Sequence, residues 1–137
     1  MATRPAEALK KVPLLAGLSA RELGRLAGQL HERKFPASST VVTEGATGTG
    51  FFVITDGEAE VEIGGQVRTK LGPGDYFGEM ALVDEEGTRS ATIKAVTELT
   101  CYGMTPWEFK PFVEEHPEVA WTLLQHMTRR LREAQSD

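Results

Sequence analysis

The chain has 137 residues, of which 40% are hydrophobic and 26% are charged, and its formal net charge at pH 7 is −5. This length suits a single domain, 1–137, and the ordinary composition argues against wholesale disorder. The acidic balance argues against direct nucleic-acid binding, and no apolar run approaches the roughly 18 residues of a membrane-spanning helix. The single cysteine, Cys101, cannot form an internal disulfide, and the first residues lack a signal-peptide core. We therefore expect a cytoplasmic protein without membrane contact.

Basic and acidic side chains are unevenly distributed along the chain. Residues 1–34 carry 7 basic and 3 acidic groups, or +4. Residues 35–100 carry 4 and 11, or −7, and residues 101–137 carry 4 and 6, or −2. The field of the acidic middle section repels anions. Any anion site there must therefore be local, with its donors held in place in advance.

The first part of the chain shows helical periodicity. Ser19 and Glu22 have the spacing of a capping box, in which each side chain bonds the other residue's backbone N–H. An apolar face follows at helical spacing, formed by Leu23, Leu26, Ala27 and Leu30. A weaker helical stretch covers Glu7–Val12. We expect N-terminal helices over about 5–33.

From about 35 to 104 the pattern changes to short strands separated by glycine-rich turns. The strand-like runs are VVTE, FFVIT, EAEVEI, QVRTKL, TIKAV and LTCYGM. Glu58–Ile63 alternates strictly between acidic and apolar residues, which predicts a strand with one solvated face. Gly64-Gly65 then predicts a tight hairpin to the next strand. Many short strands of this kind indicate a sandwich or small barrel.

Helical periodicity returns after Met104. Thr105, Pro106 and Glu108 occupy N-cap, first-turn and capping-box positions of a helix expected to end near Val113. A longer helix begins at Pro117, so that C-terminal helices cover about 105–134. Its apolar stripe consists of Ala120, Leu124, Met127, Leu131 and Ala134. Such a stripe packs either on its own domain or against a second copy as a dimer seam, and both interpretations stay open.

One segment, LGPGDYFGEMALVDEEGTRSATIKAV, differs from its neighbours. Residues 78–82 suit a single helical turn between two strands, followed by an acidic loop over 84–87. The first turn of a helix offers free N–H groups to an anion, and Gly78 lets the backbone approach closely. Arg89 can add a bidentate guanidinium, the preferred partner of a phosphate. The alternative is that Arg89 only pairs with the acidic loop and that Glu79 only caps a turn.

FGEMAL followed by TRSAT resembles the phosphate-binding cassette of the cyclic nucleotide-binding domain family, of the catabolite activator protein and protein kinase A regulatory subunit type. LLAGLSARELGRLAGQL and VVTEGATGTGFFVITDGEAEVEI are similar to the leading helices and first strands of the same family. The resemblance implies an α+β fold. Its expected parts are an eight-stranded antiparallel, jelly-roll-like β-roll, flanking N-terminal and C-terminal helices, and a short phosphate-binding helix.

The resemblance also implies a ligand-binding site. Its residues are Gly78, Glu79, Met80, Ala81, Arg89, Ser90 and Ala91. Glu79 would accept a hydrogen bond from the ribose 2′-hydroxyl, and Arg89 would pair with the cyclic phosphate. The hydroxyl of Ser90 and the backbone N–H groups of Met80 and Ala81 would complete the phosphate site.

The function implied is that of a non-catalytic regulatory module that binds cAMP and relays occupancy through its C-terminal helices. Ser90 resembles the residue of cAMP-responsive bacterial members. The alternatives are a cGMP-preferring module and a ligand-free interaction scaffold with the same fold. A homodimer through the C-terminal helix, or an unidentified effector protein, is the expected partner.

No metal, cofactor or enzymatic activity is expected. A metal-dependent β-roll enzyme would need histidines on its strands. We expect His31, His116 and His126 to lie on or beside helices, outside the strand section. Trp107 and Trp121 are predicted to be packing residues, although an aromatic residue near the last helix could cover the purine.

Overall fold

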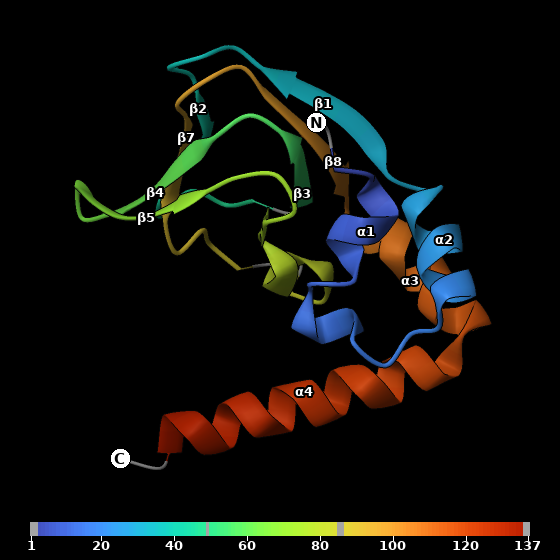
Figure 1. Ribbon diagram of the computed structural model, residues 1–137. Coiled ribbons are helices and arrows are strands. Elements are labelled where there is room, and N and C mark those ends of the chain that lie inside the picture. The colour runs from blue at the N-terminus through green and yellow to red at the C-terminus, as the bar shows by residue number, and fades with distance from the viewer. Residues whose placement is uncertain (1–2, 49, 85–86, 136–137) are drawn as a thin grey trace.

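Two four-stranded antiparallel sheets form the central part of a computed structural model, which describes residues 3–48, 50–84 and 87–135 (Figure 1). The strand orders are β1-β8-β3-β6 in one sheet and β2-β7-β4-β5 in the other. The strands are β1 (His31–Phe35), β2 (Thr40–Val42), β3 (Phe51–Asp56), β4 (Ala59–Ile63), β5 (Gln66–Leu71), β6 (Tyr76–Phe77), β7 (Thr92–Ala95) and β8 (Leu99–Met104). The predicted eight-stranded antiparallel β-roll is confirmed.

The β4–β5 hairpin forms where the two glycines predict it. Gly64 and Gly65 have φ values of 61° and 81°, as a turn with two left-handed residues requires. The predicted alternation on β4 holds only near the roll, because Ala59 is fully buried while Ile63 is 39% exposed. The hairpin tip projects from the roll in Figure 1. Ile63 therefore has no opposing sheet to pack against.

Helices flank the roll at both ends of the chain. They are α1 (Pro5–Leu9), η1 (Pro13–Leu15), α2 (Ala20–Ala27), the short η2 (Glu79–Leu82), α3 (Pro106–Glu115) and α4 (Pro117–Gln135). The predicted capping box of α2 is present, since Ser19 N donates to Glu22 Oε1 at 2.9 Å and Glu22 N donates to Ser19 Oγ at 3.1 Å. Among the described residues, none of the helices is both long and apolar enough to cross a membrane.

The predicted N-terminal helices extend too far. α2 ends at Ala27, and His31–Phe35 form strand β1, which pairs with Leu99–Gly103 of β8. All of β1 except Phe35 is exposed, so backbone hydrogen bonds hold the strand and no apolar pattern marks it. The roll therefore starts at 31 instead of 35, and His31 lies on a strand, contrary to the prediction.

α3 is fixed at its first turn, where the sequence predicts a cap, and it ends at Glu115 instead of near Val113. Thr105 N donates to Glu108 Oε1 at 3.0 Å, and His31 Nε2 contacts the other carboxylate oxygen of Glu108. Burial alone would raise the pKa of Glu108, but the hydrogen bonds from the Thr105 backbone and from His31 outweigh it and lower the pKa.

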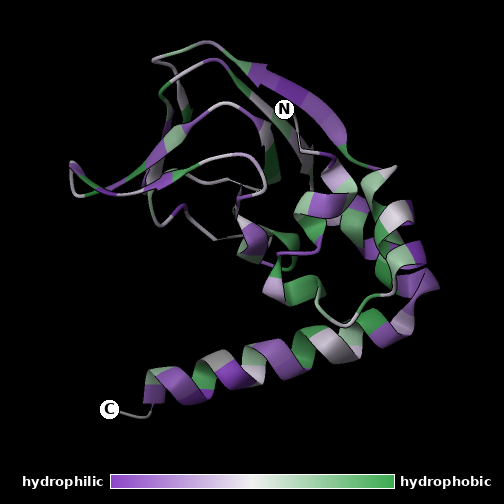
Figure 2. Cartoon of the chain, in the orientation of Figure 1, coloured by the Kyte–Doolittle hydropathy of each residue, from purple (hydrophilic) through white to green (hydrophobic). Residues whose placement is uncertain are grey.

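The predicted apolar stripe of α4 packs on the domain only in part, because Met127 lies partly buried against the core while Leu124 and Leu131 do not. Val119 is fully buried and Leu123 is 7% exposed, whereas Leu124 and Leu131 are each 59% exposed. The domain therefore packs against residues one position earlier on the helix. Trp121 is 65% exposed and is not a packing residue here, nor is Trp107, at 59%. Figure 2 shows hydrophobic residues recurring along α4 beyond the part that lies against η1 and α3.

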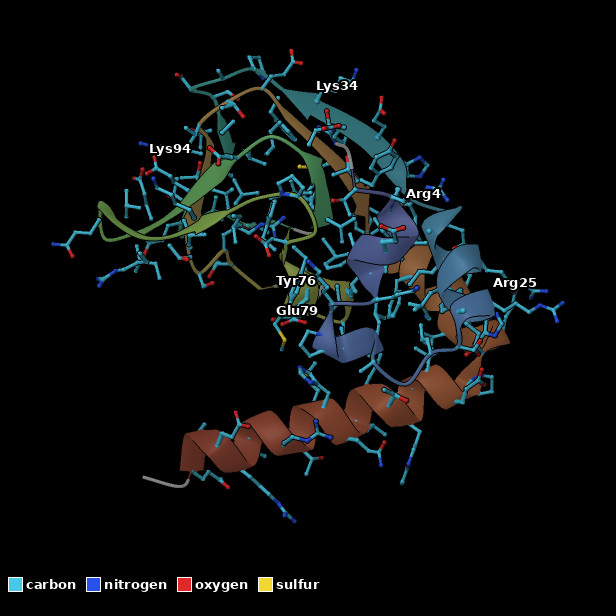
Figure 3. All side chains as sticks on the ribbon, viewed as in Figure 1. Arg4, Arg25, Lys34, Tyr76, Glu79 and Lys94 are labelled. Atoms are coloured by element: carbon cyan, nitrogen blue, oxygen red, sulfur yellow. The ribbon has the colours of Figure 1, made fainter. Side chains whose placement is uncertain are left out.

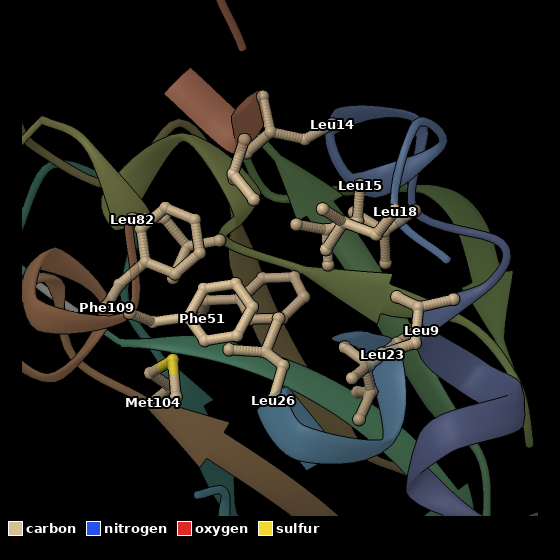
Figure 4. Close-up of a cluster of buried hydrophobic side chains, with 14 of the residues drawn as sticks. Leu9, Leu14, Leu15, Leu18, Leu23, Leu26, Phe51, Leu82, Met104 and Phe109 are labelled. Atoms are coloured by element: carbon tan, nitrogen blue, oxygen red, sulfur yellow. The ribbon is translucent and has the colours of Figure 1, made fainter. Parts of the chain in front are cut away.

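Two hydrophobic cores stabilise the protein. The roll core contains Phe77, Ile93, Leu99 and Cys101, and burial raises the pKa of the Cys101 thiol to about 12. The predicted buried position of Cys101 is thus confirmed. The helical core lies between α1, α2, α3, α4 and the face of β3, and Figure 4 shows it around Phe51. Leu82, the last residue of η2, belongs to this second core.

Candidate functional site

A cavity of about 350 Å³ opens between the roll, η2 and the segment 87–91. Its size falls in the range of about 300–1,000 Å³ that is typical of small-molecule sites. All seven residues predicted to bind a ligand line this cavity, namely Gly78, Glu79, Met80, Ala81, Arg89, Ser90 and Ala91. The structure thus brings together the two halves of the motif, which are separated by the acidic loop. That they bind a ligand stays a prediction.

Gly78 connects β6 to η2 in a conformation that favours glycine. Its φ is 78°, and a Cβ at this position would lie 2.5 Å from Gly50 O and 2.6 Å from Arg89 Nη1. Any side chain here would therefore collide with the backbone and with the guanidinium. The predicted single helical turn after Gly78 is present as η2.

The backbone of Arg89 is anchored to the loop that precedes β3. Arg89 N donates to Ala46 O and Gly45 N donates to Arg89 O, both at 2.8 Å. Thr47 and Thr88 form an isolated antiparallel bridge beside them. The backbone of Arg89 is consequently held like that of a strand residue, which fixes the point from which its side chain extends into the cavity.

The guanidinium of Arg89 is half-buried against glycines that the sequence interpretation did not single out. A Cβ at Gly48 would lie 2.9 Å from Arg89 Cζ, and one at Gly50 would lie 3.5 Å from Arg89 Nη2. We call Gly48, Gly50 and Gly78 the glycine cradle. Burial lowers the pKa of Arg89 because it removes water from the cation. An anion in the cavity would offset this loss of hydration by pairing with the guanidinium.

Glu79 is half-buried, lines the same cavity as Arg89, and begins η2. Figure 3 shows the labelled Tyr76 and Glu79 on the side of the roll that faces α4. Met80 is 38% exposed, whereas Ala81 is 8% exposed. Ala81 N donates to Gly78 O at 2.9 Å, so this amide already has a partner. To bind a phosphate, it would have to exchange or share that hydrogen bond.

The rest of the cavity combines apolar walls with the acidic loop. The apolar lining consists of Val42, Val61, Leu71, Phe77 and Ile93. Asp84 and Gly87 also line it, while residues 85–86, on which the alternative pairing of Arg89 partly depends, lie outside the described residues. Among the described lining residues there is no histidine or cysteine. The arrangement suits a small molecule with one anionic end and one flat or apolar end.

Comparison with known proteins gives the same result as the geometry. A profile of the cyclic nucleotide-binding domain matches residues 32–116. The chain is 33% identical over 131 residues to the cyclic AMP receptor protein of Thermus thermophilus, covering 92% of this chain. It is 39% identical over 94 residues to the cAMP-dependent protein kinase regulatory subunit of Aspergillus fumigatus, covering 66% of this chain.

A solved structure extends the likeness to nearly the whole fold. The N-terminal domain of a transcriptional regulator from Streptomyces coelicolor superposes with a TM-score of 0.85 at 29% identity, covering 95% of this chain and 93% of that one. This chain spans 60% of the length of the Thermus protein and 22% of the Aspergillus subunit. The sequence profile, the relatives and the fold agree, and the chain belongs to the cyclic nucleotide-binding domain family.

Proposed function

We propose that this domain binds a cyclic nucleotide, with cAMP preferred, and acts as a regulatory module without catalysis of its own. The observation that carries the proposal is the half-buried guanidinium of Arg89, held in the glycine cradle beside η2. Arg89 would pair with the cyclic phosphate, assisted by Ser90, and Glu79 would accept a hydrogen bond from the ribose 2′-hydroxyl. The apolar walls of the cavity would hold the base.

Two lines of support favour cAMP over cGMP. Ser90 lines the cavity and follows Arg89 directly, as in cAMP-responsive bacterial members of the family. The similar proteins from Thermus and Aspergillus both have cAMP in their names. Affinities measured for both nucleotides test this preference, because a serine hydroxyl is also able to bond the amino group of guanine.

The path from ligand to C-terminal helices would run through η2. Its first residues face the cavity, while Leu82 at its end packs in the helical core with Phe109 and Phe51. If the amide of Ala81 exchanges its bond to Gly78 O for a phosphate oxygen, η2 must shift. Leu82 would then move with it, and α3 and α4 would repack, which couples occupancy to helix position.

The exposed apolar face of α4 supports an assembly step. Leu124 and Leu131 are each 59% exposed, and Trp121 lies on the same helix at 65% exposed. We propose that this face pairs with a second copy of the chain or with an effector protein. Light scattering after size-exclusion chromatography tests the first option, and a monomer both with and without cAMP would refute it.

Calorimetric titration with cAMP and cGMP tests the binding proposal. Arg89→Ala should weaken cAMP binding by about 2–5 kcal/mol, or roughly 30-fold to 4,000-fold, because it leaves a buried phosphate without its counter-charge. Arg68→Ala is the matched control, because Arg68 is exposed on β5 and its substitution removes the same charge from the roll. Absence of heat at millimolar concentrations of both nucleotides would discard the proposal and favour the ligand-free scaffold. Tighter binding of cGMP would overturn the base preference only.

A further inference from the structure

Away from the cavity, three potential metal ligands from three segments converge at the α3–α4 junction. They are Glu22 on α2, His116 between the two helices, and Glu118 in the first turn of α4. Their ligand atoms all lie within 4.8 Å of one another. His116 Nδ1 is 3.4 Å from Glu22 Oε2 and 3.5 Å from Glu118 Oε1. Figure 3 shows this end of the molecule near the labelled Arg25.

The two separations from His116 Nδ1 are longer than direct charge-assisted hydrogen bonds and suit a shared ion. Charge-assisted hydrogen bonds are shorter, at about 2.7–2.9 Å. Zinc binds nitrogen and carboxylate oxygen at about 2.0–2.2 Å, so neighbouring ligands on a tetrahedron lie about 3.3–3.6 Å apart. Both separations from His116 Nδ1 fall within that interval. An ion therefore fits with small side-chain adjustments.

Two of the three ligands, Glu22 and His116, are also held in place before any ion arrives. The capping box fixes Glu22, because its Oε1 accepts the hydrogen bond from Ser19 N, and its Oε2 lies near both His116 and Glu118. The ring of His116 packs against Phe112 at a centroid distance of 4.6 Å. The side chains of Glu22 and His116 are 18% and 15% exposed, whereas that of Glu118 is 57% exposed. The exposed side gives access to an ion and to water.

We propose that Glu22, His116 and Glu118 bind a divalent transition-metal ion of the zinc type, with water completing its coordination. Two carboxylates and a neutral imidazole carry a charge of −2, which a divalent cation balances. One nitrogen and two oxygen ligands suit zinc or cobalt, whereas magnesium and calcium prefer oxygen ligands throughout. Arg21 and Arg25 border the same depression, and their charge limits the affinity. The bound ion ties α2 to the start of α4.

Titration of the whole chain with Co²⁺ and Zn²⁺ tests this site, and it is independent of nucleotide binding. We expect one Co²⁺ per chain with the visible absorption bands of tetrahedral cobalt, displacement by Zn²⁺, and no response to Mg²⁺. His116→Gln and Glu118→Gln should each weaken binding at least about tenfold, since loss of even an outer-sphere partner has that effect. Glu118 is exposed, so its variant keeps the test valid if the His116 variant fails to fold.

The matched control is His31→Gln, because His31 has a single carboxylate partner, Glu108, and no third ligand in the described structure. Its metal binding should equal that of the wild type. Two results would overturn the proposal. One is the absence of saturable binding at millimolar Zn²⁺, and the other is binding that His116→Gln and Glu118→Gln leave unchanged.

Discussion

Replacing Gly48 by alanine should weaken nucleotide binding although residue 48 offers no side chain to the ligand. A Cβ at this position would overlap Nε of Arg89 and lie 2.9 Å from Cζ, and ordinary contact begins at 3.4 Å. The Cζ atom must therefore retreat by about 0.5 Å, and Nε by more. Because the guanidinium is rigid and planar, the whole group leaves its place beside Gly78.

The size of the effect follows from the bond that is lost. A displacement of this size converts a short charge-assisted hydrogen bond into a long, poorly aligned one. Hydrogen bonds to charged groups contribute about 1.5–3 kcal/mol, which corresponds to roughly 10- to 150-fold in affinity. Stability should change little, because the group that must move is the far end of a flexible side chain.

Calorimetry with cAMP on five proteins, namely the wild type, three single variants and one double variant, separates this explanation from a general effect. Gly72→Ala is the control, because a Cβ there meets nothing within 4 Å. If Gly48 acts only through Arg89, then Gly48→Ala should cost nothing further in an Arg89→Ala background. Wild-type affinity for Gly48→Ala would refute the reasoning, and so would full additivity of the two substitutions.

Three further predictions concern stability and reactivity. Leu82→Ala should lower the free energy of unfolding in urea by about 2–5 kcal/mol, whereas the exposed Leu124→Ala should stay within about 0.5 kcal/mol, and equal losses would contradict the packing. Cys101, with its pKa raised to about 12, should react with a thiol reagent at pH 8 only after unfolding, and rapid labelling of the native protein would be inconsistent with its burial. The pKa of Glu108 is lowered in the folded state, so its carboxylate contributes stability above the unfolded pKa, and this contribution disappears as the pH falls through the folded pKa. The stability difference between wild type and Glu108→Gln should thus be present at neutral pH and shrink below about pH 4.5, and a difference that grows in acid would reverse the sign.

Features that depend on residues close in sequence were predictable. The capping box at Ser19 and Glu22 and the hairpin at Gly64-Gly65 both form as predicted, because each depends on residues at most three positions apart. The juxtaposition of Gly78 and Arg89 was also anticipated, through a motif whose spacing the family shares. In these cases local chemistry and the fold agree.

Three details that depend on distant segments were missed, although the roll itself was predicted from the family resemblance. Strand β1 is held by backbone pairing to β8, and its side chains show no apolar pattern. The paired residues are far apart in the sequence, since Glu32 and Tyr102 are separated by 70 positions. The packing face of α4 is set by where the helical core lies, so Val119 and Leu123 are buried instead of Leu124. The part of the glycine cradle formed by Gly48 and Gly50 had only a weak signal, namely two glycines just before a strand.

The position of Leu82 has a consequence for how the sequence of this domain can evolve. A four-residue element lines the cavity at one end and contributes a core side chain at the other. If this domain binds a nucleotide as proposed, a substitution that repositions η2 to raise the affinity must also alter the helical core, so affinity and thermal stability vary together. Raising the affinity without lowering the stability therefore requires two substitutions, one in the lining of the cavity and one among the residues that surround Leu82.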